Sequence, residues 1–432
     1  MNRKAIIFLL LIILVLTPVF FGKKKTSIKI TEVSTSCGVK AKQIKLKSNN
    51  VANIKCRFKN AGVLHNSLDK HGISAIVGEL LCRKVGRLSP EETKEELMKL
   101  GIDGPDTYTT GDHFIISFRV LKSRAPEALH FLAPVFIQPE FTKSDLEFIK
   151  EKYPIMSDQE TTPPRGLLLE KLLNLLYPNH NYGMNITGTA QAILSITESD
   201  VRDFVRKHFG KDNLEVFFTG DLSLSEVDAW SKILFAQLPK SCGKESLQDD
   251  IAKFHPSKER DFTIQKLNMK DIVGVICGVR LDGLTARELA AVYILAETLF
   301  NTEIGDFNEE LRVQKITHSI NDYEILPRQL STVFYFWVNL WKNDLAKFQK
   351  YLNEKISQYP SRLNLKKLMR TRQFFIESTR CGFAEIENLD KKIKFGELPF
   401  EEVDGDTIAA TAKKLFDPSM IQIVYIREGN EK

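Results

Sequence analysis

The chain has 432 residues, of which 43% are hydrophobic and 27% are charged, as is usual for a globular protein. This length exceeds that of one typical core, so two or three domains are expected. The formal net charge is +6, but five of the positive charges lie within the first 25 residues, and residues 26–432 carry only about +1. Because no basic stripe with interleaved aromatics follows, nucleic acid is not an expected partner.

The N-terminus carries an apolar segment of the kind used for export. Ala5–Phe21 comprises 17 residues without charge, flanked by Arg3 and Lys4 on one side and by three lysines on the other. No A-x-A-like cleavage site follows, so residues 1–25 are predicted to be an uncleaved signal-anchor, with a cleaved signal peptide as the alternative. The body is therefore expected to be exported, either periplasmic or anchored to the inner membrane and facing the periplasm.

Six cysteines are spread along the chain without a C-x-x-C pair, at positions 37, 56, 82, 242, 277 and 381. A zinc site built from cysteines is not expected, whereas one or two disulfides are compatible with export. Cys277 lies in the apolar run Ile272–Val279, which is typical of a buried strand, so it is predicted to be a core thiol.

A helix–turn–strand pattern occurs twice. In residues 196–222, Thr197 is predicted to cap an amphipathic helix, which a polar turn connects to the strand Leu214–Thr219. Residues 404–427 repeat the acidic start, the helix, the turn and a strand, Ile421–Ile426.

A second pair of segments agrees in order. Phe114–Val120 is predicted to be a strand before the helix Ala125–Ile137, and Val333–Leu340 a strand before the helix Asp344–Gln358. The pattern indicates an α+β fold made by duplication; two unrelated domains with similar endings are the alternative. The predicted units are a first repeat at 28–240, a polar linker at 241–260 and a second repeat at 261–432.

Several segments together resemble one known family. They are GTAQAILSITESDVRDFVRKHFGKDNLEVFFTGDLS (188–223), TYTTGDHFIISFRVL (107–121), PEFTKSDLEFIKEK (139–152) and, in the second half, ELR (310–312). Their order resembles the pitrilysin or insulinase-like (M16) zinc peptidases, which include the subunits of the mitochondrial processing peptidase. The resemblance implies two tandem insulinase-like α/β repeats that form one half of a clam-shell.

The family's metal motif, H-x-x-E-H, falls on HGISAIVGELL (71–81). This stretch has the apolar spacing of an amphipathic helix. The resemblance puts the two histidine positions on Ala75 and Glu79 and the general base on Gly78. Alanine and glycine side chains offer no lone pair to a metal ion or a proton, so neither a metal site nor a catalytic residue is expected here. The family's third ligand would fall near Glu160 or Thr161.

A rearranged zinc site is the alternative, because His65, His71, Glu79 and Cys82 lie close in sequence. His71 and Glu79 are eight residues apart, which is about 12 Å along a helix. They cannot bind one ion unless the helix breaks, so no zinc is expected in this chain.

The second half carries a different family feature. In paired members, an Arg and a Tyr of the second repeat help to hold substrate against the partner's zinc. Here the corresponding stretch is LRVQKITHSI (311–320), which places Arg312 and His318 at these positions and implies substrate binding by both. The alternative for Arg312 is a surface ion pair with Glu309 or Glu310. The family's glycine-rich loop, FNTEIGDFNEEL (300–311), keeps one glycine, so its function is not carried over.

The resemblance therefore implies a catalytically inactive homologue that acts as the non-catalytic, peptide-enclosing subunit of a zinc metallopeptidase complex. Its partners would be a zinc-bearing sister subunit, in a heterodimer, an unfolded peptide substrate, and a membrane if the N-terminal segment is uncleaved. The alternative is a stand-alone, membrane-associated peptide-binding or scaffold protein without proteolysis. Serine or cysteine catalysis has no supporting motif in the sequence.

Overall fold

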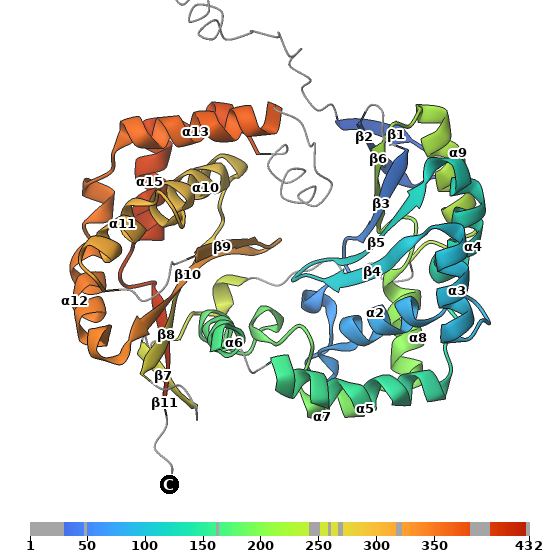
Figure 1. Cartoon of the computed structure of the whole chain (residues 1–432), viewed down its shortest axis with the longest axis horizontal. Helices are drawn as coiled ribbons and strands as arrows, with labels where there is room; N and C mark the ends of the chain where they lie inside the picture. Colours follow the sequence, from blue (N-terminus) through green and yellow to red (C-terminus); the bar gives the residue numbers. More distant parts are fainter. Residues whose placement is uncertain are drawn as a thin grey trace, which may run out of the picture.

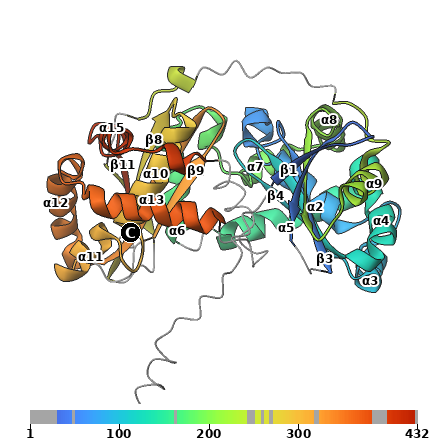
Figure 2. The same ribbon diagram turned by 90° about the horizontal axis from the view of Figure 1, so that it is seen from above.

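Two β-sheets, each backed by helices, form two lobes that lie side by side (Figures 1 and 2). The computed structural model describes residues 30–46, 50–160, 164–241, 251–257, 261–266, 271–316, 322–380 and 398–428. The predicted N-terminal signal or anchor at 1–25 lies outside these residues. Within the described part of the chain, no helix is long and apolar enough to cross a membrane.

The first lobe is built on a six-stranded sheet in the order β1-β2-β6-β3-β5-β4. β2 and β6 are parallel, and the other neighbours are antiparallel. The strands are β1 (Ile30–Ser34), β2 (Lys40–Lys45), β3 (Val51–Phe58), β4 (Asp103–Thr109), β5 (Phe114–Leu121) and β6 (Leu214–Gly220).

Helices cover one face of this sheet and enclose the first core. Three of them start with capping boxes, in which a Ser or Thr side chain and an acid three residues later satisfy each other's backbone N–H groups. The predicted cap at Thr197 is confirmed. The helices are α2 (Ile73–Arg83), α3 (Pro90–Leu100), α4 (Ala125–Ile137), α5 (Lys143–Glu160), α7 (Ala190–Ser195), α8 (Glu198–His208) and α9 (Leu224–Phe235).

The second lobe is built on a five-stranded sheet in the order β7-β11-β8-β10-β9. Its strands are β7 (Asp261–Lys266), β8 (Ile272–Asp282), β9 (Asp322–Pro327), β10 (Ser331–Trp341) and β11 (Gln422–Glu428). Its helices are α10 (Ala286–Phe300), α11 (Asp306–Val313), α12 (Leu345–Ile356), α13 (Leu365–Arg380) and α15 (Gly405–Leu415). Cys277 is buried in this core as a thiol, as predicted.

The two sheets share their strand order. β2-β6-β3-β5-β4 in the first lobe corresponds to β7-β11-β8-β10-β9 in the second, and in each series the first pair is parallel and the rest antiparallel. The predicted strand–helix pairs occupy corresponding places: β5 precedes α4 as β10 precedes α12, and α8 precedes β6 as α15 precedes β11.

Helix α6 (Pro164–Leu176) comes from the first half of the chain but packs on the second sheet (Figure 1). Glycines of β8 allow its close approach. A Cβ at Gly278 would lie 2.6 Å from Leu172 Cδ2, and one at Gly274 would lie 3.1 Å from Leu168 Cδ1. The second sheet is therefore covered on both faces, by α6 on one and by α10 to α15 on the other.

Part of the predicted linker also packs against the second lobe. Residues 251–253 form a short 3-10 helix, and Ile251 is buried beside α6. Arg280, itself 4% exposed, donates hydrogen bonds to the carbonyl groups of Leu176 and Phe254. This segment is therefore tied to the second lobe at residues 251–257.

The lobes meet at two corresponding hairpin turns. Asp112 in the β4–β5 turn accepts hydrogen bonds from the hydroxyl of Tyr182 and, at 2.8 Å, from the backbone N–H of Gln329 in the β9–β10 turn. Arg328 stacks over the Tyr182 ring and donates to its carbonyl at 2.8 Å. Because Asp112 and Tyr182 are only 5% and 1% exposed, these bonds lie in a buried contact between the lobes.

Candidate functional site

Helix α2 carries the degenerate motif and forms as its sequence predicts. Its apolar stripe of Ile73, Ile76, Val77, Leu80 and Leu81 is buried in the first core. The helix is amphipathic, and the motif positions lie beside this stripe rather than within it. Contacts of α2 with β4 and α8 hold it against the sheet edge.

The backbone before α2 is fixed by a glycine pair. Gly72, the residue that caps the helix, has φ +95°, and a Cβ there would lie 2.7 Å from the Thr187 carbonyl oxygen. A Cβ at Gly188 would lie 2.5 Å from the His71 carbonyl oxygen. The two glycines let the 187–189 segment touch the start of α2, so they set the position of the motif.

The three motif positions do not converge on a metal-binding space. Ala75 is half-buried, Gly78 is buried and Glu79 is exposed. The space above Gly78 is filled by Thr107 of β4, because a Cβ at residue 78 would lie 2.5 Å from Thr107 Oγ1 and 3.3 Å from its Cβ. The family's proton acceptor is therefore absent, and its place is closed by a neighbouring side chain.

Cys82 lies one helical turn beyond Gly78 and contacts the same threonine. Its thiol donates to Thr107 Oγ1 at 3.6 Å. Burial raises the pKa of the Cys82 thiol to about 11. The Cys82 thiol is therefore protonated at neutral pH.

His71, the second member of the rearranged set, is already hydrogen-bonded at both ring nitrogens. Nδ1 lies 2.8 Å from the Leu68 carbonyl oxygen, to which it donates, and the Thr189 N–H donates to Nε2 at 3.3 Å. This requires the neutral Nδ1–H tautomer and leaves no lone pair for a metal. The remaining member, His65, packs its ring against that of His208, with centroids 5.8 Å apart.

Zinc therefore does not fit the residues of this helix. In the residues that the structure describes, no three His, Cys, Asp or Glu side chains are grouped closely enough to hold a metal ion. Glu160, one of the two predicted third-ligand positions, is the last residue of α5, and Thr161 lies outside the described residues.

Arg312, a predicted substrate-binding residue, is exposed on α11 and donates to the Glu303 carbonyl oxygen at 2.8 Å. It does not pair with Glu310, whose carboxylate accepts from the Tyr351 hydroxyl at 2.7 Å and lies 3.7 Å from Lys355 Nζ. α11 packs in the second core, on the face of the second sheet opposite to α6. The other predicted residue, His318, lies outside the described residues.

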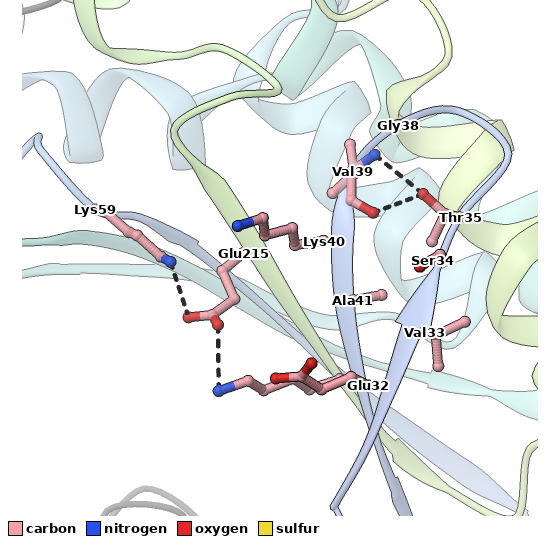
Figure 3. A pocket seen from close by; sticks show the side chains of 11 residues that line it. Glu32, Val33, Ser34, Thr35, Gly38, Val39, Lys40, Ala41, Lys59 and Glu215 are labelled. Atoms are coloured by element: carbon pink, nitrogen blue, oxygen red, sulfur yellow. Dashed lines mark hydrogen bonds and ion pairs between the residues drawn. The ribbon is translucent and has the colours of Figure 1, made fainter.

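A charged cluster on the first sheet was not anticipated. The Glu215 carboxylate on β6, which is 5% exposed, is bonded by Arg57. It also lies 3.3 Å from Lys42 Nζ and 3.9 Å from Lys59 Nζ (Figure 3). Burial acts to raise the pKa of Glu215, but the three positive charges outweigh it and hold the pKa below its usual value. The signal available in the sequence was the alternation of apolar and basic residues through IKCRFK (54–59).

Two family models match most of the chain. Residues 49–190 match the model described as Insulinase (Peptidase family M16), and residues 195–359 match the model described as Peptidase M16 inactive domain. Helix α2 lies within the residues that match the Insulinase model. The inactive-domain model begins at residue 195, so its description does not refer to α2.

The curated relatives are distant. The chain is 19% identical over 200 residues to the mitochondrial-processing peptidase subunit beta of Dictyostelium discoideum, covering 44% of this chain and 42% of the relative. It is 22% identical over 212 residues to an uncharacterized zinc protease of Rickettsia bellii, covering 49% of this chain and 47% of the relative. The aligned parts thus span less than half of each relative.

Solved structures are similar over nearly the whole chain. A peptidase M16 inactive domain from Pseudomonas fluorescens superposes with a TM-score of 0.77 at 19% identity, covering 94% of this chain and 99% of the other. A protease from Helicobacter pylori superposes with a TM-score of 0.75 at 17% identity, covering 93% and 99%. At this identity the likeness establishes the mixed α/β fold. Together with the two matching models, it shows that the chain belongs to the insulinase-like peptidase family M16.

Proposed function

We propose that this chain is a non-catalytic M16 homologue that pairs with a zinc-bearing sister subunit and, with it, encloses unfolded peptide substrate. The observation that carries the proposal is the closed space at Gly78, where the Thr107 side chain fills the volume that a general base would need. On this proposal the chain has no peptidase activity and no resident cofactor, and zinc is bound only by the sister.

The pairing is supported by the shared strand order of the two sheets. We infer that the halves are tandem insulinase-like repeats, at 28–240 and 261–432, and that together they make one half of a clam-shell. A half-shell of this kind needs a second chain to close around a peptide. The similarity to a mitochondrial-processing peptidase subunit supports the same assignment.

We propose that the chain acts outside the cytoplasm, because its N-terminal segment resembles an export signal. Residues 1–25 would export the chain, leaving it periplasmic or anchored to the inner membrane. Arg312 and His318 are the proposed substrate-binding residues of the second repeat. Among the described residues, the Arg312 guanidinium donates to the Glu303 carbonyl through one N–H group, which leaves its other donors for a peptide carbonyl.

The test is to purify the tagged full chain from its host and identify what co-purifies. We expect a homologue with an intact H-x-x-E-H motif, zinc in proportion to that homologue alone, and peptide cleavage only by the pair. Stoichiometric zinc and chelator-sensitive cleavage with the chain alone would overturn the proposal. Peptide binding by the chain alone, with no peptidase partner and no cleavage, would instead favour the scaffold alternative.

A further inference from the structure

One face of the first sheet, which no helix of the described residues covers, carries a row of positive charges. Alternate residues of a strand share a face, so these side chains lie on the same side. The register places Lys40 of β2 opposite Glu215, and Glu215 opposite Arg57 of β3. We call this set the basic strip: Lys40, Lys42, Lys55, Arg57 and Lys59.

The basic strip is turned toward the second lobe. Figure 1 shows α4 and α9 on one side of the first sheet and the second lobe on the other. The residues between those of the strip, Ile54, Cys56 and Phe58, are buried with the helices in the first core. The strip therefore lies on the inner face of the molecule, where a peptide held between the lobes would be in reach.

The strip has more positive charge than its own acids neutralise. Glu215 is the carboxylate that Lys42, Arg57 and Lys59 share. Glu32 of β1 is the residue opposite Lys42 in the β1–β2 register. Asp106 of β4 lies in the same row as Lys55, since both residues are paired with Ser117 of β5. Among the described residues, these three acids thus face the five basic residues of the strip, which leaves an excess of positive charge beside a cavity of about 430 Å³ (Figure 3).

Aromatic rings hold these cations in place. Lys42 Nζ and Arg57 Cζ lie 5.5 Å and 5.0 Å from the ring centroid of Phe217, and Lys55 Nζ lies 5.2 Å from that of Tyr108. Such contacts favour a cation over the ring face. Because the cations are positioned before any ligand arrives, an anionic ligand loses less conformational freedom on binding.

We propose that the basic strip is a docking surface for the acidic side chains of an extended peptide, so that the enclosed substrates are rich in Asp and Glu. This inference rests on the proposed function. Lys55, Arg57 and Lys59 project at every second residue, about 7 Å apart along the strand. Alternate side chains of an extended peptide repeat at the same distance, so carboxylates at alternate positions match the strip.

Lys55 should couple the binding of an acidic peptide to the uptake of protons. Burial, with the nearby charge of Arg57, lowers the pKa of Lys55 to about 7. A peptide carboxylate beside Lys55 favours its charged form and raises this pKa. Binding of an acidic peptide near pH 7 therefore takes up protons, whereas binding of an uncharged peptide does not.

The test measures binding of three unstructured peptides of equal length to the full chain, with its sister subunit where one co-purifies. The first peptide has Asp and Glu as its ionisable residues, the second has Lys and Arg, and the third has none. We expect the acidic peptide to bind most tightly, to lose affinity with added salt, and to take up protons in calorimetry across buffers of different ionisation enthalpy. Equal or tighter binding of the basic peptide overturns the inference but leaves the proposed function standing. If no peptide binds, the proposed function fails as well.

The matching variant is Lys40→Gln/Lys59→Gln, which leaves Lys42 and Arg57 to neutralise Glu215. We expect affinity for the acidic peptide to fall roughly fivefold to tenfold, as for two partly exposed charge contacts, with an unchanged melting temperature. The control is Lys94→Gln/Lys99→Gln, on exposed positions of α3, with unchanged affinity. Equal effects of the two double variants overturn the proposal. So does tighter binding of single-stranded DNA than of the acidic peptide, since the ligand would then be a phosphate chain.

Discussion

Thr107 occupies the space that a side chain at Gly78 would need. A Cβ at position 78 would meet Thr107 Oγ1 at 2.5 Å, a separation that a real Cβ does not tolerate. The loss of the zinc motif is therefore not confined to helix α2, because strand β4 has filled the adjoining volume. Restoring H-x-x-E-H on the helix alone would leave a glutamate without room.

This contact predicts a strong coupling between positions 78 and 107. Gly78→Ala in the natural background is expected to destabilise the chain by about 1–3 kcal/mol, because the added methyl overpacks against Thr107. In a Thr107→Ala background, the same change should become neutral or stabilising by roughly 0.5–1 kcal/mol, since alanine favours a helix over glycine. Urea unfolding of the four proteins in this double-mutant cycle measures the coupling.

Gly86 provides the control for this cycle, because a Cβ there would meet nothing within 4 Å although its φ is +58°. Gly86→Ala should lower the free energy of unfolding only through its backbone strain. This effect should be the same with and without Thr107→Ala. Additive effects of the changes at 78 and 107 would contradict the closed-space description.

The hydrogen bond from Tyr182 to Asp112 should matter for the contact between the lobes. Tyr182→Phe removes the hydroxyl and leaves the buried Asp112 carboxylate with the Gln329 N–H as its remaining described partner. We expect a loss of about 1–3 kcal/mol in the free energy of unfolding, as for a buried polar group deprived of a partner. Protease digestion under native conditions should also cut the variant faster if the lobes separate more often.

Tyr177→Phe is the comparison for that variant. It removes a buried hydroxyl bonded at 2.6 Å to Ser331 Oγ, which is a neutral partner. Its cost should be smaller, because hydrogen bonds to charged groups are stronger than neutral ones. A larger effect of Tyr177→Phe would argue against Asp112 as the main link between the lobes.

Sequence patterns predicted the elements with regular periodicity. α2, α4, α8 and α12 form within two residues of their expected positions, because each buries one apolar stripe. The strands with long apolar runs, β5, β6, β8 and β10, were also predicted. β4 was not, because DGPDTYT has no apolar alternation and its side chains are mostly half-buried or exposed.

The site was predicted only in part. The residue types at Ala75 and Gly78 were enough to predict that imidazole and carboxylate groups are missing. The filling of the space by Thr107 depends on the packing of helix α2 against strand β4, a contact between separate elements that no local pattern reports. The packing of α6 on the second sheet was missed for the same reason, since its partners Gly274 and Gly278 lie about a hundred residues away.

Arg312→Ala tests the proposed role of the second repeat. We expect cleavage by the assembled pair to fall about tenfold or more, as when an oxyanion donor is lost, while assembly is unchanged. Arg206→Ala, which removes an exposed ion pair with Asp203 on α8, is the matched control. Size-exclusion chromatography checks assembly, and peptide turnover checks activity. Turnover equal to that of the control would mean that Arg312 only holds the Glu303 loop.

The contacts of Asp145 predict the pH range in which α2 loses a stabilising interaction. Its carboxylate accepts from the Thr142 N–H and hydroxyl, each at 2.8 Å, and lies 2.7 Å from Lys84 Nζ at the end of α2. Burial acts to raise its pKa, but the bonds from Lys84 and Thr142 outweigh it and lower the pKa to about 2. A carboxyl whose folded-state pKa is depressed stabilises the fold above its unfolded-state pKa and loses that contribution as the pH falls through the folded value.

The stabilisation by Asp145 should therefore be complete above about pH 4 and decline between about pH 4 and pH 2. Asp145→Asn is expected to lower the free energy of unfolding by about 1–2 kcal/mol at neutral pH, and the difference from the natural chain should shrink on acidification. Urea unfolding across this range measures it. Asp203→Asn, whose carboxylate is mostly exposed beside Arg206, should show a small and nearly pH-independent change. A difference for Asp145→Asn that stayed constant down to pH 2 would mean that the side chain's shape, and not its charge, anchors α5 to α2.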